Sequence, residues 1–290
     1  MSKNGLPRKP LTKRRLKNLI LNVLKNPFNM VVLVSLIILF CLIIIPLLTM
    51  ISSTFTLAQG ELRRVQGHVG DFTLYYWKYI LTGKLASAVL WGPLKNSFIC
   101  GFFTVLVSVP LGSVLAWLMI RTDLPGKKIL GLLVTVPYMI PSWTKALAWL
   151  AMFRNSTSGA NGFLAGLGIP VPDWLAYGPI AIVLCMSMHY YAFSYIMVSG
   201  ALRSINSELE EMGEIQGASK AQILRHITLP LILPSVLSAT VMTISKSIGT
   251  YGVPANLGNR IGYYTLATKM RTFIDQGPQA VGYAMSIVLV

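Results

Sequence analysis

Long apolar runs alternate with short polar segments along the 290 residues of the chain. A helix needs about 20 apolar residues to cross the hydrocarbon core of a membrane. Windows of that length predict five complete spans, at residues 30–50, 97–120, 129–153, 179–200 and 231–252. A sixth apolar run extends from Ala280 to Val290 and covers about half of the core thickness. We therefore expect an all-α, polytopic membrane helical bundle with five complete spans and a truncated sixth, as in a fragment or the first half of a longer polypeptide.

Composition and charge support this membrane setting. Hydrophobic residues make up 54% of the chain and charged residues 12%, whereas soluble domains carry about 25% charged residues. The net charge of +16 could indicate nucleic-acid binding, but eight of the 25 Lys and Arg residues lie in the first 25, directly before the first apolar run. Such a tail is typical of a cytoplasmic anchor beside anionic lipid. We expect a multi-pass protein of the inner (cytoplasmic) membrane, embedded in the lipid bilayer, with a cytoplasmic N-terminal tail at residues 1–28 and no nucleic-acid partner.

Prolines interrupt two of the predicted spans. Pro110 lies in the second span, and Pro137 and Pro141 lie in the third. Each removes a backbone donor and favours a kink. Bent or broken helices near the membrane midplane commonly line a solute path, although proline is also frequent in membrane helices generally. The sequence leaves both interpretations open.

The segment 204–234 is a markedly polar, acidic loop between two late spans. Ser207 followed by Glu210 has the spacing of a capping box, which predicts a helix that begins at Glu208. Gly217 is expected to end that helix. The first half of the loop therefore reads as one short helix followed by a glycine hinge.

A second short helix is expected after the hinge. Ser219 followed by Gln222 repeats the capping-box spacing, and the helix should end before Pro230, because proline disfavours helical geometry at the residue before it. The loop carries four glutamates, Glu208, Glu210, Glu211 and Glu214. They face only Lys220 and Arg225 nearby, which suits a groove of a soluble protein better than anionic lipid. The alternative is a helix pair that merely connects two spans at the headgroups.

Six residues of this loop are spaced in a recognisable pattern. They are Glu211, Gly217, Ile227, Leu229, Pro230 and Pro234, with nine residues between Gly217 and Ile227. The spacing and the location resemble the EAA loop of ATP-binding-cassette importer permeases, which serve binding-protein-dependent import. Two positions depart from that pattern, because Met212 and Gly213 stand where the family usually has two alanines. Gly213 keeps the small size, whereas Met212 is bulkier.

The resemblance implies that the loop is a coupling helix seated in a cleft of a separate ATPase subunit. It makes Glu211, Gly217 and Ala218 the docking core, with Met212 and Gly213 beside them. It also assigns four residues to bracing the loop against the next span, namely Leu224, Ile227, Leu229 and Pro230.

The resemblance covers residues 90–290 approximately and implies a permease domain over residues 29–290. It further implies an extracytoplasmic solute-binding protein and a second permease module, fused or separate. The chain has no GxxxxGK[ST] sequence to cradle a nucleotide phosphate, so ATP would be hydrolysed by the partner. We expect a non-catalytic subunit that binds no cofactor itself. A membrane enzyme is a poor alternative, because HExxH and GxSxG sequences are also absent.

The residues after the loop suggest which solute is carried. Residues 245–258 and the following YYTLATKM resemble the ferric-iron type of two-module permeases, which implies iron(III). Importers of polyamines, phosphonates or other small solutes remain alternatives. An ion-gradient-driven transporter is a less favoured one, since it predicts acidic residues within spans and the apolar runs contain none.

Lys246 is the principal candidate for the translocation path. An unpaired charge in mid-span is expensive and usually faces a cavity or a partner, so Lys246 either lines the path or forms a structural pair. Its polar neighbours complete the candidate set, namely Ser245, Thr250 and Tyr251. Lys145 lies nearer a span end, where it can snorkel.

Other polar and sulfur-bearing residues in the spans are expected to be structural. His189, beside Tyr190 and Tyr191, is expected to make a polar contact inside the bundle. Three cysteines occupy separate apolar runs without metal-ligand spacing, namely Cys41, Cys100 and Cys185. We expect them to be small core residues, with no metal site.

Overall fold

The computed structural model describes residues 27–61, 65–156, 159, 161–206 and 208–289. Helices dominate the described chain, and its only β-type pairing is an isolated bridge between Thr56 and Phe72. Within these residues, four helical segments are long and apolar enough to cross a membrane. They are Pro27–Ser53, Ser87–Arg121, Asp173–Ser204 and Lys220–Ile248. The architecture is the expected all-α membrane bundle.

The elements follow one another along the chain as helices joined by short connections. The first half contains α2 (Pro27–Ser53), α3 (Tyr75–Leu81), the π-helical turn η2 (Ser87–Trp91), α4 (Gly92–Arg121), α5 (Lys127–Met139), α6 (Ser142–Phe153), α7 (Phe163–Gly166) and α8 (Asp173–Ala176). The second half contains α9 (Pro179–Ser204), α10 (Glu208–Ile215), α11 (Lys220–Ile223), the π-helical turn η4 (Leu224–Thr228), α12 (Leu229–Ile248), α13 (Gly252–Leu257), η5 (Asn259–Ile261), α14 (Leu266–Gln276) and α15 (Gln279–Leu289).

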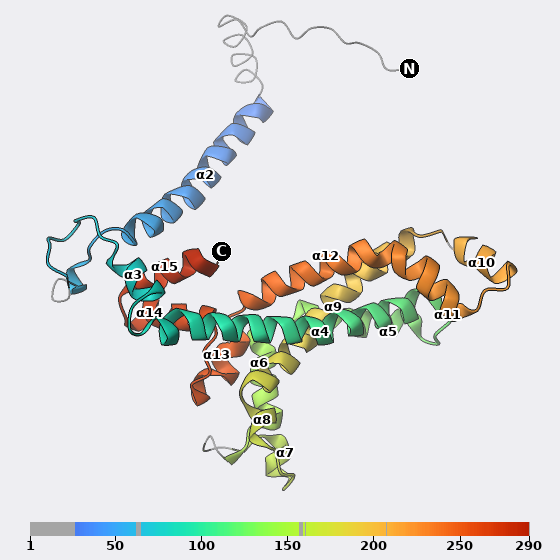
Figure 1. Ribbon diagram of the computed structural model, residues 1–290. Coiled ribbons are helices and arrows are strands. Elements are labelled where there is room, and N and C mark those ends of the chain that lie inside the picture. The colour runs from blue at the N-terminus through green and yellow to red at the C-terminus, as the bar shows by residue number, and fades with distance from the viewer. Residues whose placement is uncertain (1–26, 62–64, 157–158, 160, 207, 290) are drawn as a thin grey trace, which may run out of the picture.

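Helices α4, α9 and α12 form the centre of the bundle, and α5 packs against α9 (Figure 1). Their shared core includes Met119 of α4, Val198 and Leu202 of α9, and Ile232 of α12, all buried. Helices α4 and α9 approach closely at Gly112 of α4. A Cβ there would lie 2.8 Å from the Cβ of Ser194 and would also collide with the backbone of α9. Small residues at such crossings let membrane helices approach closely.

The third predicted span is two helices rather than one. Helix α5 ends at Met139 and α6 begins at Ser142, with Ile140 in extended geometry between them (φ −80°, ψ 130°). Proline disfavours helical geometry at the preceding residue and supplies no N–H, so Pro141 breaks the helix where a kink was expected. Pro110 and Pro137, in contrast, lie within helices α4 and α5.

The prediction that the second loop helix ends before Pro230 is wrong. Helix α11 continues through η4 directly into α12. A proline inside a regular helix collides with the carbonyl four residues earlier. Here the N–H of Leu229 donates to the carbonyl of Leu224, five residues back, and this wider turn lets the chain pass Pro230 without ending the helix.

The end of the bundle opposite α10 is built from segments far apart in sequence. Helix α3 packs against α15 and η2, and buried Tyr76, Ile80 and Met285 belong to their common core. Helices α3, α14 and α15 and the C-terminus gather at this end, and α2 extends away from it (Figure 1). Helix α15 begins at Gln279, next to the predicted start of the sixth apolar run.

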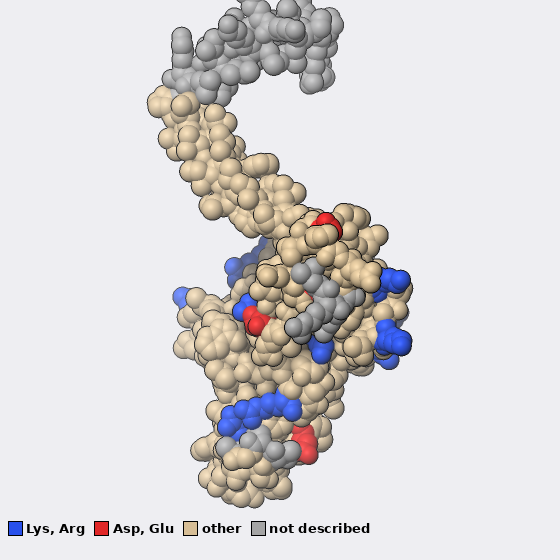
Figure 2. Space-filling model, turned by 90° about the vertical axis from the view of Figure 1, so that its left-hand side faces the viewer, with Lys and Arg blue, Asp and Glu red and all other residues tan. Residues whose placement is uncertain are grey.

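Helix α2 is apolar on every side and has no buried residue. Figure 2 shows it as a column free of Lys, Arg, Asp and Glu that projects from the rest of the chain. A helix that is hydrophobic all round requires an apolar environment, as in a membrane span. The basic tail predicted before it, at residues 1–28, lies almost entirely outside the described residues.

We expect Gly112→Ala to lower the thermal unfolding midpoint of the purified protein in detergent. The added methyl group must separate α4 from α9, and overpacking of this kind typically costs about 1–3 kcal/mol. Gly200→Ala is the matched control, because a Cβ at that helical position meets no atom within 4 Å. Equal midpoints for the two variants would contradict the close contact at Gly112.

Candidate functional site

Helices α10 and α11 close one end of the bundle (Figure 1), and the carboxylate of Glu210 ties α10 to the neighbouring helices. Glu210 forms an ion pair with Arg121 at the end of α4, with 2.9 Å between Oε2 and Nε. The hydroxyl of Thr228, in η4, donates to Glu210 Oε1 at 2.6 Å. The Arg121 and Glu210 side chains are only 15% and 18% exposed, so little water competes for the pair. This carboxylate therefore connects the loop to two of the bundle's helices.

The connection was not foreseen from the sequence, which predicted a capping role for Glu210. That role required Ser207, which lies outside the described residues. The N–H of Glu208 instead donates to the side chain of Asn206 at 3.2 Å. A basic residue at the end of one span and an acid in the next polar loop on the same side were the available signal for the Arg121–Glu210 pair.

The hinge between α10 and α11 has the geometry that the sequence predicted. Gly217 adopts the left-handed conformation (φ +82°), and its N–H donates to Glu214 while that of Ala218 donates to Gly213. These two bonds form a Schellman motif, which ends α10. Ser219 then caps α11 in a capping box: its N–H donates to Gln222 Oε1 at 2.8 Å, and its hydroxyl oxygen accepts from the N–H of Gln222 at 3.4 Å. The loop is thus a rigid pair of short helices.

The two departures from the EAA pattern point in opposite directions. Gly213 faces the second helix, where an added Cβ would lie 3.1 Å from Ile223 and 3.2 Å from Ile227. Met212 faces outward and is 55% exposed. Gly213 therefore permits the close packing of the two loop helices, and the bulk of Met212 does not disturb it.

The outward surface of the loop combines acidic and apolar side chains. Glu211 is exposed beside Met212, and Ile215 is 84% exposed. Gly217 is exposed and Ala218 half-buried, so the predicted docking core lies at the surface. We name Glu211, Met212 and Ile215 the α10 surface.

Only part of the predicted bracing set contacts the loop. Leu224 is half-buried beside Glu210 and Lys220, and Ile227 is half-buried near Gly213. Leu229 and Pro230 are exposed on α12, where they face outward from the described chain.

The candidate path residues lie around α9. The Lys246 ammonium sits 5.4 Å from the centre of the Phe193 ring, in cation–π geometry. The hydroxyls of Thr250 and Tyr190 are 2.7 Å apart, which joins the end of α12 to α9, and Thr250 also donates to the carbonyl of Lys246. Ser245 and Tyr251 are exposed. The structure therefore brings Lys246 and Thr250 together on one side of α9.

Lys145 is a path candidate that the sequence ranked lower. It is half-buried, and its ammonium contacts Nδ1 of His189 at 2.5 Å rather than extending to a headgroup. His189 thus makes the expected polar contact inside the bundle. Tyr138 stacks against both His189 and Phe193, with ring centres 5.5 and 5.7 Å away.

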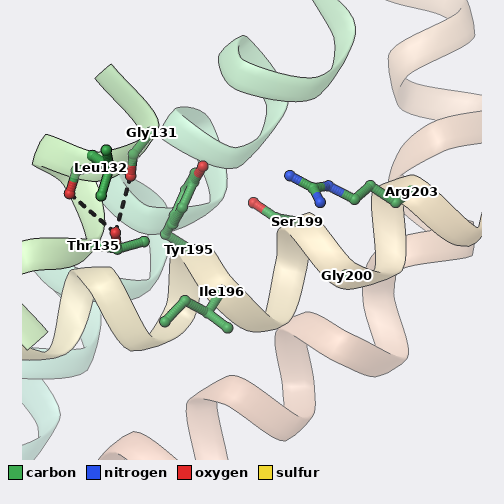
Figure 3. Close-up of a pocket in the computed structure, with 8 residues that line it drawn as sticks. All are labelled: Gly131, Leu132, Thr135, Tyr195, Ile196, Ser199, Gly200 and Arg203. Atoms are coloured by element: carbon green, nitrogen blue, oxygen red, sulfur yellow. Dashed lines mark hydrogen bonds between the residues drawn. The ribbon is translucent and has the colours of Figure 1, made fainter. Parts of the chain in front are cut away.

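A groove of about 420 Å³ continues between α5 and α9 toward the loop end of the bundle (Figure 3). It is lined by Gly131, Leu132 and Thr135 of α5 and by Tyr195, Ile196, Ser199, Gly200 and Arg203 of α9. Figure 3 shows the Ser199 hydroxyl and the Arg203 guanidinium directed toward the same side of α9. The Ser199 hydroxyl is buried and has no hydrogen-bond partner among the described residues.

The described residues contain no group of three His, Cys, Asp or Glu side chains that could hold a metal ion. Cys41, Cys100 and Cys185 carry free thiols, and the last two are buried.

Residues 108–290 match the family described as the binding-protein-dependent transport system inner membrane component. The match covers most of the chain, and the chain belongs to this family. The predicted resemblance to ATP-binding-cassette importer permeases is thereby confirmed, on a segment that contains the loop, the groove and both path lysines.

Two curated relatives and one solved structure are similar to the chain. The probable sulfate transport system permease protein cysT of Marchantia polymorpha is 27% identical over 180 residues, which are 61% of this chain and 59% of that protein. The putative 2-aminoethylphosphonate transport system permease protein PhnV of Salmonella typhimurium is 28% identical over 219 residues, covering 76% and 75%. A bacterial ABC transporter involved in the import of the acidic polysaccharide alginate shares the fold, with a TM-score of 0.66, 17% identity and coverage of 93% and 92%.

We expect Arg121→Glu to destabilise the loop, because it places two acids together where an ion pair now lies. Removing one partner of a buried ion pair costs up to about 3–5 kcal/mol, and the loop should become more accessible to protease by a corresponding factor. The measurement is the rate of limited proteolysis between α9 and α12. The charge-exchanged double variant Arg121→Glu, Glu210→Arg is expected to restore protection, and equal cleavage of the single and double variants would contradict the pairing.

Proposed function

We propose that the chain is the permease subunit of an ATP-driven importer, that it forms part of the translocation path, and that a separate ATP-binding-cassette ATPase docks on the α10 surface. The observation that carries this proposal is the loop, whose two helices are fixed to each other and whose α10 surface is exposed. Glu210 anchors it from within, and the Schellman and capping-box bonds set the angle between its two helices. A force applied to α10 by a partner would therefore pass into α4 and α12.

The α10 surface suits a soluble protein better than lipid. Its apolar side chains, Met212 and Ile215, stand beside exposed Glu211, and Glu208 and Glu214 are also exposed. Anionic lipid repels such acids, whereas an apolar centre with a charged rim is the usual anatomy of a protein interface. An amphipathic helix of this kind fits a groove in a partner.

The same proposal gives the chain its remaining partners and its location. ATP would be hydrolysed by the docked subunit, since the chain has no phosphate-cradling GxxxxGK[ST] sequence, and the chain itself would be non-catalytic and bind no cofactor. A solute-binding protein would deliver solute at the opposite end of the bundle, and a second permease module would complete the path. The location would be the inner membrane, with the N-terminus and the loop on the cytoplasmic side. The family description supports the solute-binding protein and the inner-membrane location.

Among solutes, small anions have better support than iron(III). The two curated relatives are named for sulfate and 2-aminoethylphosphonate, and neither name refers to iron or a polyamine. We therefore propose an importer of small solutes of the sulfate or phosphonate kind. The less favoured alternative, an ion-gradient-driven transporter, would need acidic side chains inside its spans, and all nine Asp and Glu residues lie outside the predicted apolar spans.

We expect Ile215→Asp to weaken ATPase binding about tenfold or more, because it places a charge at the apolar centre of the docking surface. Glu211→Lys should act in the same direction. The measurement is the dissociation constant between the purified permease and its ATPase subunit. Ile261→Asp is the matched control, an exposed isoleucine outside the loop, and it should bind as the wild type does. If Ile215→Asp and Ile261→Asp bind the ATPase equally well, the docking proposal is wrong.

A further inference from the structure

Two lysines, half-buried Lys145 and exposed Lys246, contact one aromatic cluster on α9. Lys145 of α6 contacts His189, and Lys246 of α12 lies over Phe193, one helical turn further along α9. Tyr138 of α5 stacks on both of these rings. Four helices therefore bring two cations to the same stretch of α9, beside the break between α5 and α6.

Neither lysine has an acidic partner. No ion pair joins Lys145 or Lys246 to any of the described residues, which include every Asp and Glu of the chain. A cation inside a membrane is costly unless it faces a partner, a cavity or water. The cation–π contact of Lys246 and the histidine contact of Lys145 offset only part of that cost, and neither neutralises a charge.

The two lysines offer hydrogen-bond donors and positive charge, without an acid to accept them. An ammonium only donates, so Nδ1 of His189 must accept from Lys145, and the neutral ring carries its proton on Nε2. Two further protons of Lys145 and all three of Lys246 remain available as donors. The cluster can therefore bind an anion and repels a cation, which argues against free iron(III) and polyamines.

The same face of α9 continues into the groove of Figure 3. His189, Phe193, Ile196, Gly200 and Arg203 follow one another at spacings of three and four residues, so they share one side of the helix. Arg203 is exposed and forms no ion pair within the described chain. Ser199 beside it is more than nine-tenths buried and its hydroxyl lacks a partner there. A third cation and an unsatisfied hydroxyl thus lie nearer the loop.

We propose that this face of α9 is the solute's route and that the solute binds as a small oxyanion of the sulfate or phosphonate class. Lys145 and Lys246 hold it beside the α5–α6 break, and Arg203 with Ser199 receives it nearer the loop. Sulfate and phosphonate oxygens accept several hydrogen bonds at once, which matches the two ammonium groups from α6 and α12 at the first position and the guanidinium and hydroxyl of α9 at the second. The inference rests on the proposed importer function and adds to it the sites that the anion occupies.

The test is uptake by the complete transporter, reconstituted in liposomes with its ATPase, second permease module and binding protein. The probes are radiolabelled sulfate and 2-aminoethylphosphonate, with spermidine and iron(III) as cations. We expect the wild type to import one of the two anions, and Lys145→Met or Lys246→Met to reduce that uptake by about 30-fold or more. Lys246→Arg keeps the charge and should retain most of the uptake. Arg203→Met should also reduce it.

Lys84→Met is the matched control, because it removes an exposed lysine outside this face and should leave uptake unchanged. Binding of the ATPase and the thermal unfolding midpoint are measured for every variant, so that loss of the route is distinguished from loss of docking or folding. Import of a cation but neither anion, import of neither anion, or wild-type anion uptake by the Lys145→Met, Lys246→Met double variant would each overturn the proposal. A wild type that fails to bind the ATPase would refute the importer function itself.

Discussion

The shielded ion pair between Arg121 and Glu210 is the interaction on which the loop end of the structure depends. Glu210 also accepts a hydrogen bond from the hydroxyl of Thr228, so one carboxylate joins α10 to α4 and to the turn that leads into α12. Removing either charge would leave the other partly buried without a counterion, and such a residue is costly. The pair therefore does more than add stability, because it makes the short helix α10 part of the bundle's framework.

A second constraint acts inside the bundle, where donors are in excess. The backbone satisfies itself within helices, as it must in lipid, but half-buried Lys145 and the exposed cations Lys246 and Arg203 form no ion pair with a described acid. Lys246 contacts the Phe193 ring, and Lys145 contacts the imidazole of His189. An arrangement of this kind is unfavourable in a purely structural core, whereas it suits a site where the missing charge arrives with the solute. The break between α5 and α6 lies beside it, as expected for helices that line a path.

Local chemistry made several features of the loop predictable. The start of α10 at Glu208, the hinge at Gly217 and the cap at Ser219 follow from residues close together in sequence, and the structure has each of them. Two local predictions needed correction. Pro141 breaks its helix outright. Pro230 does not end its helix, because in the π-helical turn before it the N–H of Leu229 donates to the carbonyl of Leu224, five residues back. A proline removes one backbone donor, and the geometry of the neighbouring turn determines whether the helix breaks or continues.

Sequence alone determined the class of fold, the polar loop and its two helices, and the family, because hydrophobic run length, capping and motif spacing are properties of neighbouring residues. Only the tertiary structure decided which side chains act together. Glu210 pairs with a residue 89 positions earlier, Lys145 meets a histidine 44 positions later, and Arg203 joins the path through the register of α9. Those pairings depend on the crossing and rotation of whole helices, and these are set by close contacts such as Gly112 against α9, which no local pattern encodes.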